Sequence, residues 1–163
     1  MHDQTMQSLV AELGERLEAR KWMMATAESC TGGLVGHELT NVAGSSHWYL
    51  GGIISYSNDL KMRLLGVDGR ILQTHGAVSQ PCVLDMVRGV CRVTGADVGV
   101  ALSGIAGPSG GSPDKPVGTV WIGWSVQGRA WAVCGHFSGT RREIKCQSAW
   151  TALAGLVRAI PET

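Results

Sequence analysis

The sequence lacks a marked charge imbalance and a long hydrophobic run. Its 163 residues hold 14 lysines and arginines against 13 aspartates and glutamates, for a net charge of +1. This balance gives no electrostatic reason to expect a nucleic acid or an acidic membrane surface as partner. No run of about 18 apolar residues occurs, so we expect no membrane-spanning segment. The N-terminal stretch is charged and amphipathic, unlike a signal peptide, and we therefore expect a cytoplasmic protein.

Cysteine and histidine occur without the spacing that metal sites or disulfide frameworks require. There are five cysteines, an odd number, and no two of them form a CxxC pair. The HExxH motif is absent, and so is any cluster of cysteine with histidine, so we expect no metal site. Because their neighbours are mostly apolar, the cysteines are predicted to be buried free thiols in a reducing compartment. They are Cys30, Cys82, Cys91, Cys134 and Cys146.

Glycine is abundant, and it separates helical from extended patterns. The chain has 23 glycines, a share about twice the ordinary ~7%, in pairs and short clusters between apolar segments. Such clusters are typical of tight turns and backbone-lined binding loops. Helical patterns are predicted over residues 4–20, from Thr31 onward, over 58–65, between Ser79 and Gly95, and over 141–160, and extended patterns over 22–29, 51–57, 96–104, 117–126 and 129–137.

This alternation of helices and strands predicts an α/β fold. We expect a single three-layer domain over residues 1–163, with a mixed β-sheet flanked by helices. A late β-hairpin is expected to turn at Gln127-Gly128. The loop over residues 105–116 is long for a compact domain, and loops of that length are often functional.

The segment AESCTGG, residues 27–33, places three adjacent hydroxyl or thiol side chains at the end of a predicted strand. We expect the strand to end at Ser29 and a helix to begin near Thr31, with Thr31 as its N-cap. This junction stands at the sheet edge where α/β proteins bind ligands, and Gly32 and Gly33 leave backbone N–H groups open to an oxyanion or a phosphate. The residues alone leave two interpretations open, a catalytic turn and a plain tight turn.

A serine nucleophile needs a base, and the sequence offers a lysine more readily than a histidine. No histidine comes with an obvious acidic residue to orient it. Lys61 follows the second predicted strand in SYSNDLK, so it shares the sheet edge with Ser29 if the two strands are parallel. Burial or a nearby positive charge must lower its pKa before it can act as a base, and Tyr56 and Asn58 flank it. The alternative is a lysine on a solvated helix face.

Two further segments rich in glycine and serine are candidates for anion binding. SGIAGPSGG, residues 103–111, follows a predicted strand, and its backbone amides suit an anion nest. It matches neither GxxxxGK[ST] nor GxGxxG, and a plain turn is the alternative. Gly44-Ser45-Ser46 and Arg141 are weaker candidates, since each is a short feature and exposed arginines usually face water.

Six segments of the chain, taken in order, match a known family. They are AESCTGG, GSSHWYLGGIISYSNDLK, LGV, HGAVSQ, SGIAGPSGG and KPVGTVW. They resemble the CinA C-terminal domain family and, within it, the stand-alone nicotinamide-nucleotide amidases, over about residues 5–159. The resemblance implies hydrolysis of the carboxamide of nicotinamide mononucleotide to nicotinate mononucleotide and ammonia, in pyridine nucleotide salvage. It also implies a serine nucleophile with a lysine base, no metal and no cofactor.

Carried over position by position, the resemblance assigns roles to residues of this chain. Ser29 becomes the nucleophile, Lys61 its base, and Tyr56 a helper that hydrogen-bonds to the lysine or to the substrate. Thr31, Gly32 and Gly33 are expected to supply backbone donors for the oxyanion. The ribose phosphate is expected on Ser45 and Ser46, the loop over residues 103–111 and Arg141. The residues expected to bind substrate are Thr31, Gly32, Gly33, Ser45, Ser46, Asn58, Ser103, Gly104, Gly107 and Arg141.

One position departs from the family's pattern, and two broader points stay open. Thr140 stands where many relatives carry an acidic residue before the arginine, so phosphate affinity differs here if that acid orients Arg141 in relatives. A second interpretation of the chain is a non-catalytic nucleotide-binding or interaction module, in which Lys61 only pairs with a phosphate. Six tryptophans imply apolar surface, which makes a homodimer a candidate assembly.

Overall fold

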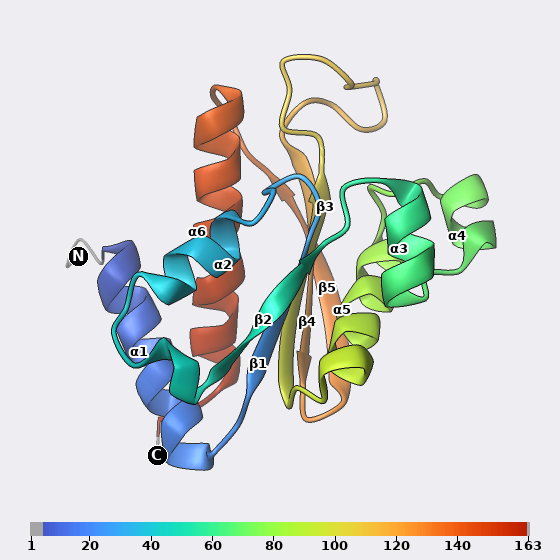
Figure 1. Ribbon diagram of the computed structural model, residues 1–163. Coiled ribbons are helices and arrows are strands. Elements are labelled where there is room, and N and C mark those ends of the chain that lie inside the picture. The colour runs from blue at the N-terminus through green and yellow to red at the C-terminus, as the bar shows by residue number, and fades with distance from the viewer. Residues whose placement is uncertain (1–4, 163) are drawn as a thin grey trace.

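The computed structural model describes residues 5–162, in which helices and strands alternate along the chain (Figure 1). The helices are α1 Met6–Arg20, α2 Leu34–Thr40, the 3₁₀ helix η1 Ser45–His47, α3 Asn58–Leu65, α4 Gly69–Thr74, α5 Gln80–Thr94 and α6 Arg141–Ala159. The strands are β1 Met24–Glu28, β2 Tyr49–Ile54, β3 Val98–Gly104, β4 Thr119–Val126 and β5 Arg129–His136. None of the helices within residues 5–162 is long and apolar enough to cross a bilayer.

The five strands form a mixed sheet in the order β2-β1-β3-β4-β5. β1 pairs in parallel with both neighbours, and Ala27 lies opposite Ile53 on β2 and Ala101 on β3. β4 and β5 extend the sheet as an antiparallel hairpin beside β3. Gln127 and Gly128 connect them with positive φ angles of 49° and 80°, as two-residue hairpin turns favour. The predicted hairpin is confirmed.

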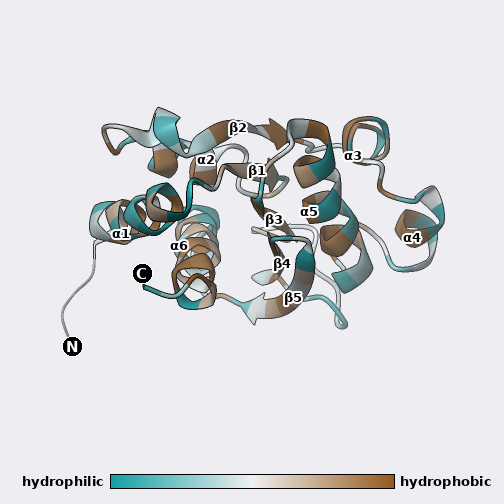
Figure 2. Cartoon of the chain, turned by 90° about the horizontal axis from the view of Figure 1, so that it is seen from below, coloured by the Kyte–Doolittle hydropathy of each residue, from teal (hydrophilic) through white to brown (hydrophobic). Residues whose placement is uncertain are grey.

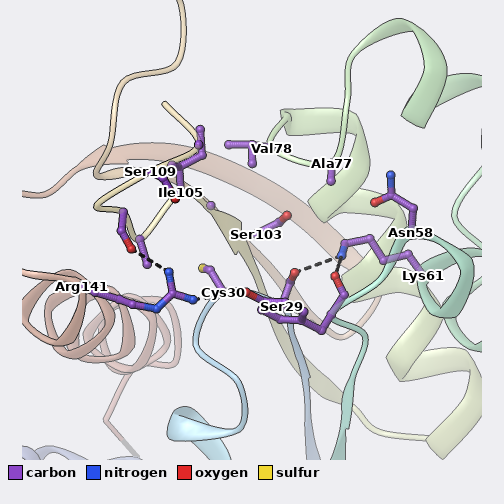
Figure 3. A pocket seen from close by; sticks show the side chains of 15 residues that line it. Ser29, Cys30, Asn58, Lys61, Ala77, Val78, Ser103, Ile105, Ser109 and Arg141 are labelled. Carbon is purple, nitrogen blue, oxygen red and sulfur yellow. Dashed lines mark hydrogen bonds between the residues drawn. The ribbon is translucent and has the colours of Figure 1, made fainter. Parts of the chain in front are cut away.

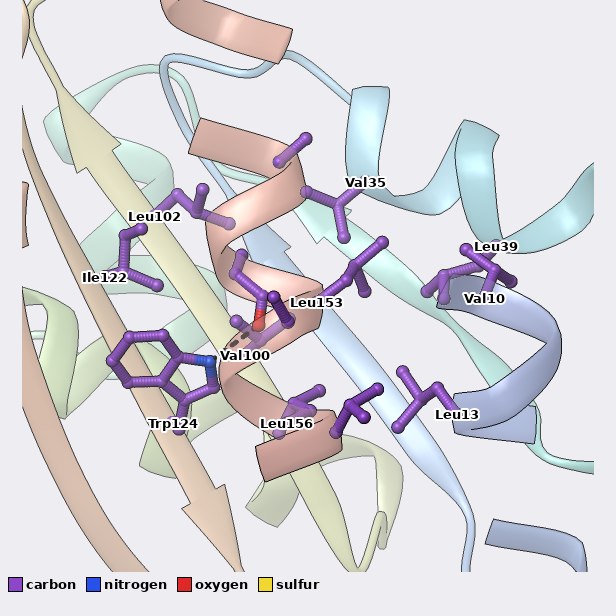
Figure 4. Close-up of a cluster of buried hydrophobic side chains, with 14 of the residues drawn as sticks. Val10, Leu13, Val35, Leu39, Val100, Leu102, Ile122, Trp124, Leu153 and Leu156 are labelled. Atoms are coloured by element: carbon purple, nitrogen blue, oxygen red, sulfur yellow. Dashed lines mark hydrogen bonds between the residues drawn. The ribbon is translucent and has the colours of Figure 1, made fainter. Parts of the chain in front are cut away.

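Helices cover both faces of the sheet, which gives three layers. α1, α2 and α6 lie on one side, and α3, α4 and α5 lie on the other (Figures 1 and 2). One buried cluster joins α1 and α6 to the sheet, and in it the indole N–H of Trp124 donates to the Ala152 carbonyl at 2.8 Å (Figure 4). A second cluster lies between α5 and the opposite face. The predicted three-layer α/β fold with a mixed sheet is confirmed.

The carboxyl ends of β1, β2 and β3 meet at one edge of the sheet because these three strands are parallel. The chain leaves β1 through α2 toward β2 on one side, and it returns through α3, α4 and α5 to β3 on the other. The two connections diverge beside β1, at the kind of switch point where open α/β sheets bind ligands. Ser29 directly follows β1 at this point.

α3 is fixed in place by a close backbone approach to α5. A Cβ built on Gly89 of α5 would lie 1.9 Å from the carbonyl oxygen of Leu65, the last residue of α3. Only glycine fits so near another backbone. The Arg92 guanidinium also donates to the Leu65 carbonyl, at 3.1 Å. These contacts hold the helix that carries Lys61.

Several element bounds differ from those predicted. The predicted helix start at residue 4 lies outside the described residues, and α1 begins at Met6. The helix expected near Thr31 begins at Leu34, and β2 begins at Tyr49, before the expected residue 51. Helix α4 was not predicted, because its six residues are too few for a clear helical period.

Candidate active site

Ser29 leaves the sheet at the end of a fully buried strand. All five residues of β1 are buried, and Ser29 is 7% exposed. Its backbone N–H donates to the Leu102 carbonyl of β3 at 3.0 Å, so the pairing of the two strands extends to the serine itself. The position of Ser29 is therefore set by the sheet, and its side chain stands at the sheet edge.

The turn after Ser29 is held by the buried carboxylate of Glu28. This residue is 2% exposed and ends β1. Its Oε2 accepts from the Thr31 hydroxyl at 2.6 Å and from the Gly33 amide at 3.0 Å. Val35 and Gly36 donate their backbone N–H groups to the same carboxylate, at 3.1 and 2.9 Å. Four donors satisfy the buried charge, and the carboxylate ties the turn to the first residues of α2.

This arrangement corrects the predicted role of Thr31. Thr31 does not cap α2, because its hydroxyl donates to Glu28. The N-cap of α2 is Gly33, so no side chain caps this helix. The prediction also missed Glu28. The one available signal was a charged residue at the end of the otherwise apolar stretch MATAE, since a carboxylate is rarely buried without partners.

Lys61 points from the first turn of α3 toward Ser29 (Figure 3). Ser57 caps this helix by accepting from the Leu60 amide at 3.2 Å. The side-chain nitrogen of Lys61 lies 3.0 Å from Ser29 Oγ, to which it donates a hydrogen bond. It also donates to the Ser55 carbonyl at 2.7 Å and to the Tyr56 carbonyl at 3.3 Å. The structure thus brings Ser29 and Lys61 together, as parallel strands β1 and β2 require.

Burial works against the charged form of Lys61. The residue is 1% exposed, and none of the hydrogen bonds or ion pairs found within residues 5–162 joins it to a carboxylate. Burial lowers the pKa of its ammonium below the ordinary 10.5, an effect that the nearby Cys82 and Cys30 thiols oppose. Burial also raises the pKa of Cys30 to about 11, so this thiol stays protonated near neutral pH. Cys30 is therefore in its weakly nucleophilic thiol form near neutral pH.

Beside the pair lies a pocket of about 340 Å³, within the usual range of small-molecule sites. Its walls come from the ends of β1 and β3, the start of α3, the segment before α5 and the loop after β3. The lining residues are Ser29, Cys30, Tyr56, Asn58, Lys61, Ala77, Val78, Ser103, Gly104, Ile105, Ala106, Gly107, Ser109, Gly110 and Arg141. Of the residues expected to bind substrate, Asn58, Ser103, Gly104, Gly107 and Arg141 line this one cavity.

The backbone donors near Ser29 are fewer than expected. The Gly32 amide donates to the Ser29 carbonyl at 3.0 Å, and the Gly33 amide is taken by Glu28. Neither glycine lines the pocket, and neither does Thr31. Within residues 5–162 the amides of Cys30 and Thr31 donate to no carbonyl oxygen, so they are the donors left in this turn.

Arg141 forms the opposite wall of the pocket. It opens α6, whose N-terminus carries a capping box between Thr140 and Glu143. Its guanidinium donates to the Gly107 carbonyl at 2.7 Å and to the Tyr56 hydroxyl at 3.2 Å. Thr140 therefore caps the helix, and the loop and the tyrosine orient the arginine. The Tyr56 hydroxyl faces Arg141, whereas it is the Tyr56 carbonyl that accepts from Lys61.

Ser45 and Ser46 are not part of this pocket. They lie on η1, before β2 begins, whereas Ser29 follows the carboxyl end of the parallel strand β1. η1 therefore sits at the opposite edge of the sheet, where His47 contacts Glu18 of α1 at 3.0 Å. Their predicted phosphate contact is wrong for the pocket of a single chain, because the stretch GSS gave no indication of which sheet edge it occupies.

The residues described form no obvious metal centre. Nowhere in residues 5–162 do three or more histidine, cysteine, aspartate or glutamate side chains gather closely enough to hold an ion. All five cysteines are free.

The fold and the site together define an α/β protein with a pocket at the switch point of its sheet and a buried serine–lysine pair inside it. The family model described as the CinA C-terminal domain matches residues 6–160. The chain belongs to the CinA C-terminal domain family.

Relatives of the chain include both short and long proteins. The chain is 45% identical over 159 residues to the nicotinamide-nucleotide amidohydrolase PncC of Enterobacter agglomerans, covering 97% of each protein. It is 44% identical over 158 residues to a putative competence-damage inducible protein of Moorella thermoacetica, of which it covers 37%. A crystal structure of a CinA superfamily protein from Klebsiella pneumoniae matches with a TM-score of 0.93 and 35% identity, over 96% of this chain and 98% of that one.

Proposed function

We propose that this protein hydrolyses the carboxamide of nicotinamide mononucleotide, giving nicotinate mononucleotide and ammonia, in pyridine nucleotide salvage. The observation that carries the proposal is the 3.0 Å contact between Ser29 Oγ and Lys61 Nζ inside a substrate-sized pocket. The relative that matches over 97% of both chains bears the name of this activity. A serine activated by a buried amine suits amide hydrolysis, which needs a nucleophile and a base at one point.

The contacts of Lys61 support its role as the base. A neutral amine has two N–H bonds and one lone pair. The carbonyls of Ser55 and Tyr56 are acceptors only, so they take the two N–H bonds. The lone pair is then directed at the Ser29 hydroxyl, which becomes the donor in their hydrogen bond.

In the first half of the proposed reaction, Lys61 accepts the proton of the Ser29 hydroxyl as Oγ attacks the carboxamide carbon. The backbone amide of Cys30, which lines the pocket and donates to no carbonyl oxygen of residues 5–162, is the donor expected for the resulting oxyanion. The carbon–nitrogen bond then breaks, and the proton held by Lys61 passes to the leaving nitrogen, which departs as ammonia. In the second half Lys61 deprotonates a water molecule, whose attack releases the carboxylate and restores Ser29.

The test is ammonia release from nicotinamide mononucleotide in the presence of a chelator. Wild type is expected to turn over, and Ser29→Ala to lose turnover while it still binds the nucleotide in calorimetry. Ser8→Ala is a matched control, since Ser8 is an exposed serine of α1. If Ser29→Ala keeps full activity, the nucleophile assignment is wrong. If wild type binds the nucleotide and releases no ammonia, the domain is the non-catalytic binding module instead.

A further inference from the structure

Lys145 lies one helical turn after Arg141 on α6 and has no assigned role. Residues four apart on a helix share a face, so Lys145 lies on the same face of α6 as Arg141, although only Arg141 lines the pocket. Its side chain reaches back over the turn that follows Ser29. A Cβ built on Gly32 would lie 3.8 Å from the Lys145 ammonium. A second cation therefore stands beside the turn, next to the wall formed by Arg141.

This cation has no anionic partner in the part of the chain that is described. Lys145 is partly buried, yet it takes part in none of the ion pairs or side-chain hydrogen bonds found within residues 5–162. The nearby Glu143 is occupied, because its carboxylate accepts from the Thr140 amide and hydroxyl at 2.7 and 2.8 Å. Like charges four residues apart on a helix repel each other, so an anion bound by both Arg141 and Lys145 would offset that repulsion.

The place of the two cations fits the shape of the proposed substrate. Figure 3 shows Arg141 on the opposite side of Cys30 from Lys61. A carboxamide held at Ser29 leaves the remainder of the nucleotide to extend away from Lys61, and its phosphate is at the end far from the carboxamide. The Cys30 thiol between them carries no negative charge near neutral pH, since burial raises its pKa to about 11. Among the ion pairs found within residues 5–162, none includes Arg141 or Lys145.

We propose that Lys145 binds the 5′-phosphate of the substrate together with Arg141, and so selects nucleotides over nucleosides. The inference rests on the proposed amidase function. Lys145 is assigned to recognition and not to the chemical step. Removing its charge is therefore expected to affect phosphorylated substrates alone.

The experiment compares two amides that differ in the phosphate. Ammonia release is measured for nicotinamide mononucleotide and for nicotinamide riboside with wild type, Lys145→Met and Arg158→Met. Methionine keeps most of the lysine stem and removes its charge. Arg158 is the matched control, because it is an exposed cation in the last turn of α6, about 20 Å along the helix from Lys145. Dissociation constants of both compounds are also measured in Ser29→Ala and in Ser29→Ala/Lys145→Met.

The expected result is a KM for the mononucleotide raised about tenfold in Lys145→Met, with little change in kcat or in the kinetics of the riboside. Arg158→Met is expected to match wild type. If kcat/KM of Lys145→Met falls equally for both amides, or does not fall for the mononucleotide, the phosphate assignment is overturned. If wild type turns over neither amide, the amidase proposal fails. The dissociation constants then test the phosphate site independently of turnover. Adding Lys145→Met to Ser29→Ala should weaken binding of the mononucleotide and leave binding of the riboside unchanged.

Discussion

Lys61 and Arg141 lie at opposite ends of one pocket, and the protein holds these two cations in different ways. Lys61 is 1% exposed, and three oxygen atoms from the ends of β1 and β2 surround its nitrogen. Arg141 is exposed at the start of a helix, where it contacts a loop carbonyl and the hydroxyl of Tyr56, a residue that is itself 63% exposed. The end of the pocket with Lys61 is therefore held by the sheet, whereas the end with Arg141 is formed by a loop and by Tyr56 at the surface.

The difference in burial indicates that the two cations have different roles. Burial destabilises the charge on Lys61, which suits a base. The forked guanidinium of an exposed arginine suits the binding of an anion. Changes at the buried end should lower kcat, because they act on the reacting atoms. Changes at the exposed end should raise KM, because they act on a part of the substrate that does not react.

The largest effect is expected from Lys61→Arg, which keeps the positive charge but cannot release a proton. We expect kcat to fall by about 10²–10⁴-fold, the usual contribution of a general base. If Lys61 is the base, its ammonium form is inactive in wild type, so kcat should rise with pH through the Lys61 pKa. That rise should come below pH 10.5, because burial lowers the pKa.

The measurement is kcat against pH, with thermal unfolding of Lys61→Arg and Lys61→Met as the check on folding. Both variants should lose activity alike if only the base is missing. A wild-type kcat that is independent of pH, or an arginine variant within tenfold of wild type, would contradict the assignment of Lys61 as base.

Stability and kcat should also fall when the turn after Ser29, at the buried end of the pocket, loses its hydrogen bonds to Glu28. Glu28→Gln keeps the side chain's shape and replaces one acceptor oxygen by an amide donor, which faces the N–H groups of residues 33–36. We expect a loss of about 1–3 kcal/mol in the free energy of unfolding, together with a lower kcat. Urea denaturation measures the first quantity and steady-state kinetics the second.

The matched control for that change is Glu38→Gln on α2, whose carboxylate makes no hydrogen bond within the described residues. It should leave both quantities near the wild-type values. If Glu28→Gln has the free energy of unfolding of wild type, the four hydrogen bonds do not hold the turn. The sheet alone would then fix the position of Ser29.

At the exposed end, Arg141→Met should act on binding. We expect KM for nicotinamide mononucleotide to rise about tenfold, as for the loss of one charged hydrogen bond, with kcat changed much less. Arg141→Lys separates charge from shape, because lysine keeps the charge and loses the fork that reaches both Gly107 and Tyr56. A drop in kcat at unchanged KM in Arg141→Met would mean that Arg141 acts in the chemical step and not in binding.

The buried end was also the more predictable one from sequence. The apolar stretch ending at Ser29 and the strand before Lys61 indicated two neighbouring strands, and parallel strands bring their carboxyl ends together. The meeting of Ser29 and Lys61 follows from these two facts. The three-layer fold followed from the same alternation of helices and strands.

The sequence could not predict contacts that depend on the path of the chain between elements. Glu28 serves the turn because residues 33–36 fold back over it, which no local spacing indicates. Ser45 and Ser46 resemble anion ligands in sequence, yet their distance from the site depends on where the chain enters β2. For Tyr56 the sequence indicated a place beside Lys61, but not which of its atoms faces Lys61.

The smallest effect is expected from Tyr56→Phe, and it tests where the boundary between the two ends lies. The variant keeps the carbonyl that accepts from Lys61 at 3.3 Å and removes the hydroxyl that accepts from Arg141 at 3.2 Å. An exposed hydrogen bond contributes at most about 1 kcal/mol, so KM should rise only severalfold and kcat should stay within about twofold. Steady-state kinetics beside Arg141→Met measures both. A loss in kcat of a hundredfold would instead mean that the Tyr56 hydroxyl turns toward the reacting amide once substrate is bound, and the tyrosine would then belong to the catalytic end.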